Sequence, residues 1–131
     1  MLEVTAAVIW NGDKFLICQR PKGKYCELLW EFPGGKIELG ETVEECVARE
    51  CREELGVTLQ IYGEFFDVVQ EHPDRVVHLH FFHAEIVAGE LAPLEHNAVA
   101  WVTQAETSKY EFCPADAKML QKNELRPPKG A

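Results

Sequence analysis

Three glutamates, Glu50, Glu53 and Glu54, have the spacing in this sequence that points most directly to chemistry. They lie at i, i+3 and i+4, so a helix would place all three carboxylates on one face. That face also carries Val43 and Val47, which should point into the core, so the acids border the buried stripe. Like charges crowded in this way repel each other unless a counter-charge neutralises them. A hard divalent cation such as Mg²⁺, which takes oxygen ligands, would supply that counter-charge.

The element that must position these acids is a helix with clear signals at both ends. Thr42 is a good N-cap, and Glu45 three residues later completes a capping box. Gly56 stands where a glycine commonly ends a helix, so the pattern predicts a helix over 43–55. Before it, the turn 33–35 is Pro-Gly-Gly, whose glycines have unusual backbone freedom. This turn would bring backbone amides and carbonyls close to whatever the carboxylates hold.

The acids belong to a longer pattern of fixed positions. It reads Gly35, five residues, Glu41, seven residues, and then Arg49-Glu50-Cys51-Arg52-Glu53-Glu54-Leu55-Gly56-Val57. This pattern resembles the Nudix box of Nudix hydrolases at every fixed position. Cys51 stands where the box usually has an aliphatic residue, and a buried thiol behaves as a small hydrophobe. A solvated acidic helix is the alternative, but it explains neither the acids beside the apolar stripe nor the glycine pair.

The resemblance implies a metal centre on this helix. Its ligands would be Glu50, Glu53 and Glu54, joined by a backbone carbonyl of Gly34 and by Glu95 from a later loop. The expected ion is Mg²⁺, with Mn²⁺ as a substitute. The ion would bridge phosphate oxygens and lower the pKa of a bound water. Either Glu50 or Glu95 could take the proton from that water, and the sequence leaves both open.

Two further residues of the pattern have supporting roles implied by the resemblance. Arg49 is expected to pair with Glu41 or with a neighbouring acid, and thereby to orient Glu50. The candidate catalytic residues are therefore Glu41, Arg49, Glu50 and Glu95.

Four residues outside the acidic helix match positions that contact the substrate in MutT-like members of the family, and a fifth candidate, Lys36, directly follows the glycine pair. Arg20 and Lys36 would meet phosphate oxygens, and Phe32 would line a nucleoside pocket. Arg75 and Asp116 would touch the base. The alternatives are a solvated loop for Arg20, surface positions for Lys36 and Arg75, and a core position for Phe32. Asp116 could instead simply favour a helix N-terminus.

The choice of substrate depends most on Asp116. An ionised carboxylate only accepts hydrogen bonds, which suits the N4 amine of cytosine or the N7–H of 8-oxoguanine. Pro-Ala-Asp at 114–116, with His-Leu-His at 78–80, resembles the MutT branch, which includes bacterial CTP pyrophosphohydrolases and 8-oxo-dGTP diphosphatases. We favour structural or pocket-lining roles for His78 and His80, because no thiolate or third histidine shares their face.

The implied reaction is hydrolysis of a nucleoside triphosphate to the monophosphate and diphosphate. Acting on oxidised or cytidine nucleotides, such an enzyme would cleanse the nucleotide pool. One alternative is a Nudix hydrolase for a dinucleoside polyphosphate or a nucleotide sugar. Another is a noncatalytic nucleotide-binding module, although a binder would not need the complete set of acids.

Composition bounds the remaining questions. The 131 residues suit one domain, 1–131, with a Pro/Gly/Lys-rich flexible tail at 126–131. The net charge of −9 argues against a nonspecific nucleic-acid or anionic-membrane surface, and a phosphate substrate would need a metal bridge. Five cysteines without a C-x-x-C pair, and no signal peptide or membrane-spanning run, predict reduced thiols and a cytoplasmic protein. A monomer and a homodimer both stay open.

The resemblance implies the Nudix fold, an α/β (α+β) architecture with a mixed and curled sheet between helices, and the remaining patterns are consistent with it. Asn11-Gly12 is a strong hairpin signal, and 72–75 reads as a turn between two long strands. Strands are expected at 4–10, 14–20, 58–70, 76–87 and 98–102, a helical turn at 104–109, and a last helix from Pro114.

Overall fold

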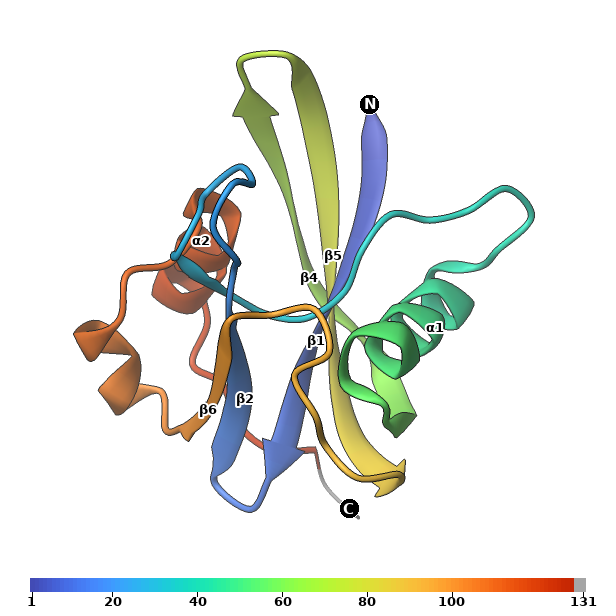
Figure 1. Ribbon diagram of the computed structural model, residues 1–131, viewed down its shortest axis with the longest axis vertical. Coiled ribbons are helices and arrows are strands. Elements are labelled where there is room, and N and C mark those ends of the chain that lie inside the picture. The colour runs from blue at the N-terminus through green and yellow to red at the C-terminus, as the bar shows by residue number, and fades with distance from the viewer. Residues whose placement is uncertain (129–131) are drawn as a thin grey trace.

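The computed structural model describes residues 1–128. Along the chain the elements are β1 (Leu2–Asn11), β2 (Lys14–Gln19), β3 (Trp30–Glu31), α1 (Val43–Leu55), β4 (Thr58–His72), β5 (Arg75–Ala88), β6 (Ala98–Val102), the 3-10 helix η1 (Ala105–Lys109) and α2 (Pro114–Lys122). A mixed sheet separates α1 from α2 (Figure 1). The predicted fold class is therefore confirmed.

The sheet is mixed because β1 pairs in parallel with β5, whereas its other pairings are antiparallel. The strand order is β3-β2-β1-β5-β4, and β6 pairs along the length of β2. β2 contacts β1 only at the hairpin base, where Asn11 lies opposite Lys14, and then diverges toward β6. This divergence curls the sheet, and the segment 33–37 runs along the freed edge of β1, where the Pro33 carbonyl accepts from the Ala7 amide at 2.8 Å.

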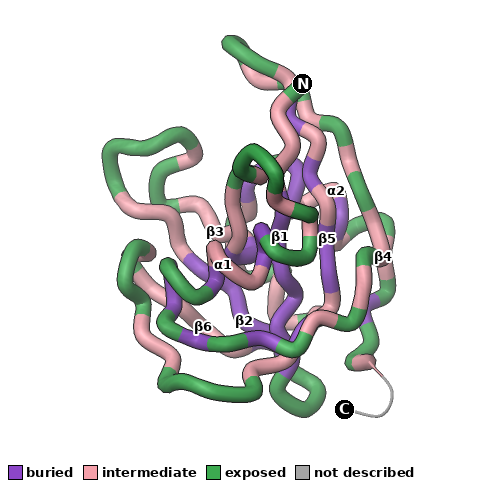
Figure 2. The backbone as a smooth tube through the Cα atoms, turned by 90° about the vertical axis from the view of Figure 1, so that its right-hand side faces the viewer, coloured by how far each residue is buried: buried purple, intermediate pink, exposed green. Residues whose placement is uncertain are grey.

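The core lies on both faces of β1. Every residue from Thr5 to Trp10 is buried, as expected for a strand that is covered on each side. Ala7 and Ile9 face the cluster beneath α1, while Ala6 and Val8 face the cluster beneath α2. Figure 2 shows the buried backbone concentrated in the central strands, with exposed loops around them.

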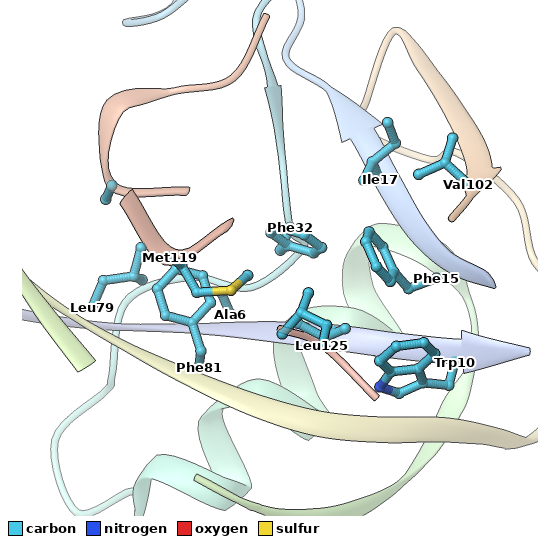
Figure 3. Packing of buried hydrophobic residues seen from close by; sticks show 12 residues of the cluster. Ala6, Trp10, Phe15, Ile17, Phe32, Leu79, Phe81, Val102, Met119 and Leu125 are labelled. Atoms are coloured by element: carbon cyan, nitrogen blue, oxygen red, sulfur yellow. The ribbon is translucent and has the colours of Figure 1, made fainter. Parts of the chain in front are cut away.

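The cluster on the α2 side is rich in aromatic rings. The ring of Phe32 lies with its centroid 5.6 Å from that of Phe15 and 6.3 Å from that of Phe81. Met119 of α2 completes this layer (Figure 3). The segment that leads into the Pro-Gly-Gly turn is therefore anchored in the core by its own aromatic residue.

Helix α1 has the boundaries that its sequence predicts. The Thr42 hydroxyl accepts a hydrogen bond from the Glu45 amide at 3.1 Å, and the Glu45 carboxylate accepts one from the Thr42 amide at 2.9 Å. Gly56 ends the helix with φ of 73°, in the left-handed region that glycine adopts without strain. These local signals place the three glutamates on the helix.

Some boundaries differ from the expectations. β4 and β5 extend to His72 and Arg75, so the predicted turn shrinks to Pro73 and Asp74. β3 was not expected, because two residues carry no periodicity. α2 stops at Lys122, although Leu125 beyond it still packs in the core. Residues 126–128 of the predicted tail have no regular structure, and 129–131 lie outside the described residues.

Candidate active site

The three glutamates of α1 share a face but lie at different depths. Glu54 is only 6% exposed and sits beside Leu55 on the core-facing side of the helix. The Glu50 side chain is about a fifth exposed (18%), and that of Glu53 is more than half exposed (54%). The exposure of the carboxylates on this face therefore decreases from Glu53 through Glu50 to Glu54, and the Glu54 carboxylate is enclosed by protein.

Arg49 ties these acids to the loop that precedes the helix. Its Nε and Nη2 donate to the two carboxylate oxygens of Glu41, at 2.6 and 3.0 Å. Its Nη1 donates to Glu50 at 2.8 Å and to Glu53 at 3.2 Å, and Nη2 also reaches the carbonyl of Lys36 at 3.1 Å. The implied pairing of Arg49 with Glu41 is present. The hydrogen bonds from Arg49 lower the pKa of Glu41 to about 2, so this carboxylate stays ionised.

The glycine pair lets the backbone approach both β1 and the acids. A Cβ atom on Gly35 would overlap the Glu50 carboxylate, and one on Gly34 would overlap the backbone of Thr5. The Gly35 carbonyl accepts a hydrogen bond from the Thr5 amide at 2.8 Å, so it is engaged with β1. A role for the Gly34 carbonyl as a metal ligand stays a prediction.

The donor set on α1 fits a divalent cation. Burial raises the pKa of Glu54 well above its usual range, and the neighbouring charges of Glu50, Glu31 and Glu95 raise it further. A buried carboxylate among other acids is costly to ionise unless a cation joins it. Glu50, Glu53 and Glu54 offer the oxygen ligands that Mg²⁺ and Mn²⁺ take.

Glu95 is brought to the end of α1 by a backbone hydrogen bond. The amide of Leu94 donates to the carbonyl of Glu54 at 3.0 Å, which fixes the loop between β5 and β6 against the helix. Glu95 itself is exposed, and its charge contributes to the raised pKa of Glu54. A role for Glu95 at a metal centre stays a prediction.

The five predicted substrate-binding residues line a single cavity of about 240 Å³. Gly34, Gly35 and Glu31 line it too, so the cavity borders the turn that leads to the acids. The lining residues from the predicted set are Arg20, Phe32, Lys36, Arg75 and Asp116. Residues almost a hundred positions apart are thus brought together beside α1.

Asp116 lies at the start of α2 and also lines the cavity, and its contact with a base stays a prediction. It lies in the first turn of α2, and its Oδ1 accepts a hydrogen bond from the Phe32 amide at 3.1 Å. Burial, and then the charge of Glu31, raise the pKa of Asp116 to about 8. In the neutral form its carboxyl can donate a hydrogen bond as well as accept one. The expectation of an ionised, acceptor-only carboxylate therefore needs this correction.

The family follows from sequence comparison. Residues 1–122 match the family model of the NUDIX domain. The chain belongs to the Nudix family. It is 39% identical over 122 residues to a CTP pyrophosphohydrolase of Escherichia coli, covering 92% of this chain and 90% of the relative. It is 34% identical to an 8-oxo-dGTP diphosphatase of the same species, covering 92% and 95%.

Solved structures agree with the Nudix fold. The solution structure of the E. coli ORF135 protein matches with a TM-score of 0.80 and 36% identity, covering 92% of this chain and 86% of that one. A MutT protein from Methanosarcina mazei matches with a TM-score of 0.81 and 27% identity, covering 92% and 90%. The curled mixed sheet between two helices is thus shared with MutT proteins.

Two residues near the Nudix acids were missed by sequence reasoning. Nε2 of His96 lies 3.0 Å from Oε2 of Glu31 and 3.6 Å from Oε1 of Glu54. Oε1 of Glu31 in turn accepts from Arg20 at 3.1 Å. Among the described residues, Nδ1 of His96 is buried without a hydrogen-bond partner. In the sequence, Glu31 could have been noticed as a charged residue between two aromatic ones, Trp30 and Phe32. No sequence pattern around His96 suggests a functional role.

This connection changes the interpretation of Arg20. Its Nε donates to the Tyr25 carbonyl at 2.6 Å while its Nη1 is held by Glu31. The guanidinium is therefore fixed in direction at the cavity wall rather than free in a solvated loop. Lys36 and Arg75 also line the cavity, and both are exposed. Their long, flexible side chains could reach the charged groups of a ligand bound there.

Proposed function

We propose that this chain is a Mg²⁺-dependent nucleoside triphosphate pyrophosphohydrolase that releases a nucleoside monophosphate and diphosphate. The observation that carries the proposal is that two features on opposite faces of the sheet meet at the Gly34-Gly35 turn, which lines the cavity and touches Glu50. A graded cluster of carboxylates on α1 suits a cation, and a cavity beside it gathers an aromatic ring, three cations and a buried acid. A nucleoside triphosphate needs both features, because the base and the phosphates have different chemistry.

The residues of the chain have separate tasks in this proposal. Glu50, Glu53 and Glu54 would hold the cation, which supplies positive charge to the phosphate oxygens and a more acidic water. Arg49 holds Glu50 in direction through its 2.8 Å contact. Glu50 or Glu95 takes the proton from the attacking water.

Base recognition is assigned to Asp116. A neutral carboxyl group donates through its hydroxyl and accepts through its carbonyl oxygen. Cytosine offers N3 as an acceptor beside the N4 amine, and 8-oxoguanine offers O6 beside its N7–H. Each of these edges matches the pair of groups on a protonated Asp116, whereas the N7 of guanine lacks the donor. We therefore propose cytidine nucleotides and 8-oxo-dGTP as substrates, which makes nucleotide-pool cleansing the cellular role.

The names of the relatives point in the same direction, since two of them are a CTP pyrophosphohydrolase and an 8-oxo-dGTP diphosphatase. As further parts of the proposal, the chain forms one domain over 1–131, works in the cytoplasm as a monomer or homodimer, and binds no nucleic acid. No helix among the described residues is long and apolar enough to cross a membrane.

The test is product analysis across a panel of nucleotides. The parent protein is incubated with CTP, dCTP, dGTP, 8-oxo-dGTP, a dinucleoside polyphosphate and a nucleotide sugar, with and without Mg²⁺ or Mn²⁺. We expect monophosphate and diphosphate from CTP, dCTP or 8-oxo-dGTP, and only with metal. Turnover confined to the last two compounds would favour the other Nudix activities. Binding of nucleotides without any turnover would favour a noncatalytic module.

A second arm compares Asp116→Asn with the parent on dCTP and 8-oxo-dGTP. Asn presents an amide donor and a carbonyl acceptor permanently, so the variant keeps the pair of groups but loses its dependence on pH. Turnover of both nucleotides by the parent, relative to that by the variant, should therefore fall as pH rises through about 8. An equal pH dependence in the two proteins would remove Asp116 from base recognition.

A further inference from the structure

A second group of metal-ligating side chains lies outside the cavity and away from the acids of α1. It consists of Glu3 at the start of β1 and of His78 and His80 on β5. The parallel pairing of the two strands sets Glu3 opposite His78 and Thr5 opposite His80. In Figure 1 the first residues of β1 run beside β5 where the β4–β5 hairpin extends beyond the helices.

These histidines do not line the substrate cavity. Val77 and Leu79 do, so the alternating His78 and His80 point to the opposite face of the sheet. On that face Phe82 and Ala84 continue into the core beneath α1. The pocket-lining interpretation of the two histidines is therefore wrong.

Three ligand atoms converge at this place. Oε1 of Glu3 lies 2.7 Å from Nε2 of His80 and 2.9 Å from Nδ1 of His78. Glu3 lies on β1, more than seventy residues before the two histidines in the sequence. The spacing of His78 and His80 alone therefore does not indicate this third ligand. The side chains of both histidines are mostly buried, at 21% and 12% exposure, so the rings are held in place.

The outer nitrogens of both rings are also occupied by carboxylates. Nε2 of His78 lies 2.7 Å from Asp67, and Nδ1 of His80 lies 2.9 Å from Glu64. A neutral imidazole has one N–H and one lone pair. If both rings are neutral and each N–H faces its outer carboxylate, both lone pairs face the Glu3 oxygen, so positive charge is needed between them. A proton on each ring supplies that charge, and so does one divalent cation held by all three atoms.

We propose that Glu3, His78 and His80 form a site for Zn²⁺ or a similar borderline divalent metal, distinct from the carboxylate centre on α1. Two imidazoles and one carboxylate are a frequent zinc ligand set, and Asp67 and Glu64 hold the rings as outer carboxylates do at such sites. Three carboxylates around two imidazoles also leave a negative surplus that a divalent cation offsets. Mg²⁺ suits this set poorly, because it prefers oxygen ligands.

Such a metal would have a structural consequence for the active site. Glu3 also accepts a backbone hydrogen bond from Ile37 at 3.1 Å, in the loop between the glycine pair and α1. The ion would join β1 to β5 beside that loop, while Asp67 and Glu64 attach β4. Binding would therefore raise the melting temperature of the folded protein.

The test uses untagged protein and Zn²⁺ alone as the titrant, in buffer with excess Mg²⁺ to occupy oxygen-only sites. Calorimetry should show one Zn²⁺ per chain, and His78→Gln and His80→Gln should each weaken its affinity at least about a hundredfold. Asp67→Ala should weaken it by about 10- to 100-fold through loss of the outer contact. His72→Gln, at the β4–β5 tip outside the group, is the matched control and should bind as the parent does.

X-ray absorption of the zinc-loaded parent protein gives a readout that needs no variant. We expect two imidazole rings in the first shell, with Zn–N distances of about 2.0–2.1 Å. No Zn²⁺ binding by the parent, an oxygen-only shell, or equal affinity in the His78→Gln and His80→Gln variants would each overturn the proposal. None of these outcomes bears on the nucleotide hydrolysis proposed above, which is measured separately with Mg²⁺.

Discussion

At the scale of single residues, the depth of Glu54 separates a metal site from a solvated acidic face. An exposed glutamate would need no cation, whereas a carboxylate that is 6% exposed beside other acids does. The family box predicted which residues would be acidic but not how deeply each one would be buried. That depth depends on β4 and on the loop that follows β5, both distant in sequence.

Glu54→Gln should therefore lose the response to metal while keeping the fold. The amide has nearly the same shape and needs no proton when buried, so at neutral pH the metal-free variant should melt at or above the temperature of the parent. Mg²⁺ should raise the melting temperature of the parent by several degrees, since a ligand that binds the folded state stabilises it. The variant should show little of this rise in a thermal melt. Glu44→Gln, an exposed acid on the same helix, is the control and should respond as the parent does.

The Glu50 carboxylate occupies space that is free only because residue 35 is a glycine. Gly35→Ala should cost only about 0.5–1.5 kcal/mol in the free energy of unfolding, because the Glu50 carboxylate must move away from the new Cβ and give up its contact with Arg49. Urea unfolding of the variant in a Glu50→Ala background provides the check. The cost should shrink once the carboxylate is removed, and an undiminished cost would mean that the overlap is not its source.

At the scale of elements, the loop 36–41 is held to α1 chiefly by Arg49. The guanidinium makes two parallel hydrogen bonds to Glu41 and a further one to the backbone of Lys36. Both side chains of the pair are mostly buried, at 19% and 12% exposure. The direction of Glu50 and the position of the loop thus depend on the same side chain.

A double-mutant cycle on Arg49 and Glu41 tests this link. With Arg49→Lys and Glu41→Gln, the coupling measured by urea unfolding should be clearly favourable, because lysine cannot reproduce the fork of two donors. The exposed pair Arg126 and Glu124, with side chains 77% and 78% exposed, is the matched control and should show almost none. Equal coupling in the two pairs would contradict the role of Arg49 in docking the loop.

The elements also show what sequence can and cannot predict. α1 was predictable to its end residues, because Thr42, Glu45 and Gly56 act on their own neighbours. β3 was not, because its two residues become a strand only by pairing with β2. Likewise, His96 reaches Glu31 and Glu54 through a loop whose course no local pattern determines.

At the scale of the whole molecule, the substrate cavity forms where β1, β3, β5 and α2 meet. Its candidate lining residues were found through the family resemblance, and the fold brings all five together. The electrostatic state of Asp116 could not be found in that way. Its raised pKa comes from complete burial and from the charge of Glu31, which are products of tertiary packing.

The pKa of Asp116 makes the stability of the molecule depend on pH. Folding raises this pKa from its usual 3.8 to about 8. Between these values the folded state holds a proton that the unfolded chain has lost, so the free energy of unfolding falls as pH rises through this window. Below it both states are protonated and the residue contributes nothing. Asp116→Asn has no carboxyl group to lose this proton, so its stability lacks this dependence on pH. The melting temperature of the variant minus that of the parent should therefore increase steadily from about pH 4 to about pH 8.

Thermal melts across this range check the prediction. The control is Asp13→Asn, at an exposed hairpin position, whose difference from the parent should stay flat with pH. A constant difference for Asp116→Asn would show that the buried carboxyl does not carry the proton.

The central claim is that a buried acid on α1 is needed for hydrolysis of a nucleoside triphosphate. Its most direct test compares the turnover of CTP and 8-oxo-dGTP by the parent and by Glu54→Gln in saturating Mg²⁺. We expect the parent to release diphosphate and the variant to lose at least about a hundredfold in kcat, with the Glu44→Gln control unchanged. Full turnover by Glu54→Gln, or none by the folded parent on either nucleotide, would contradict the account.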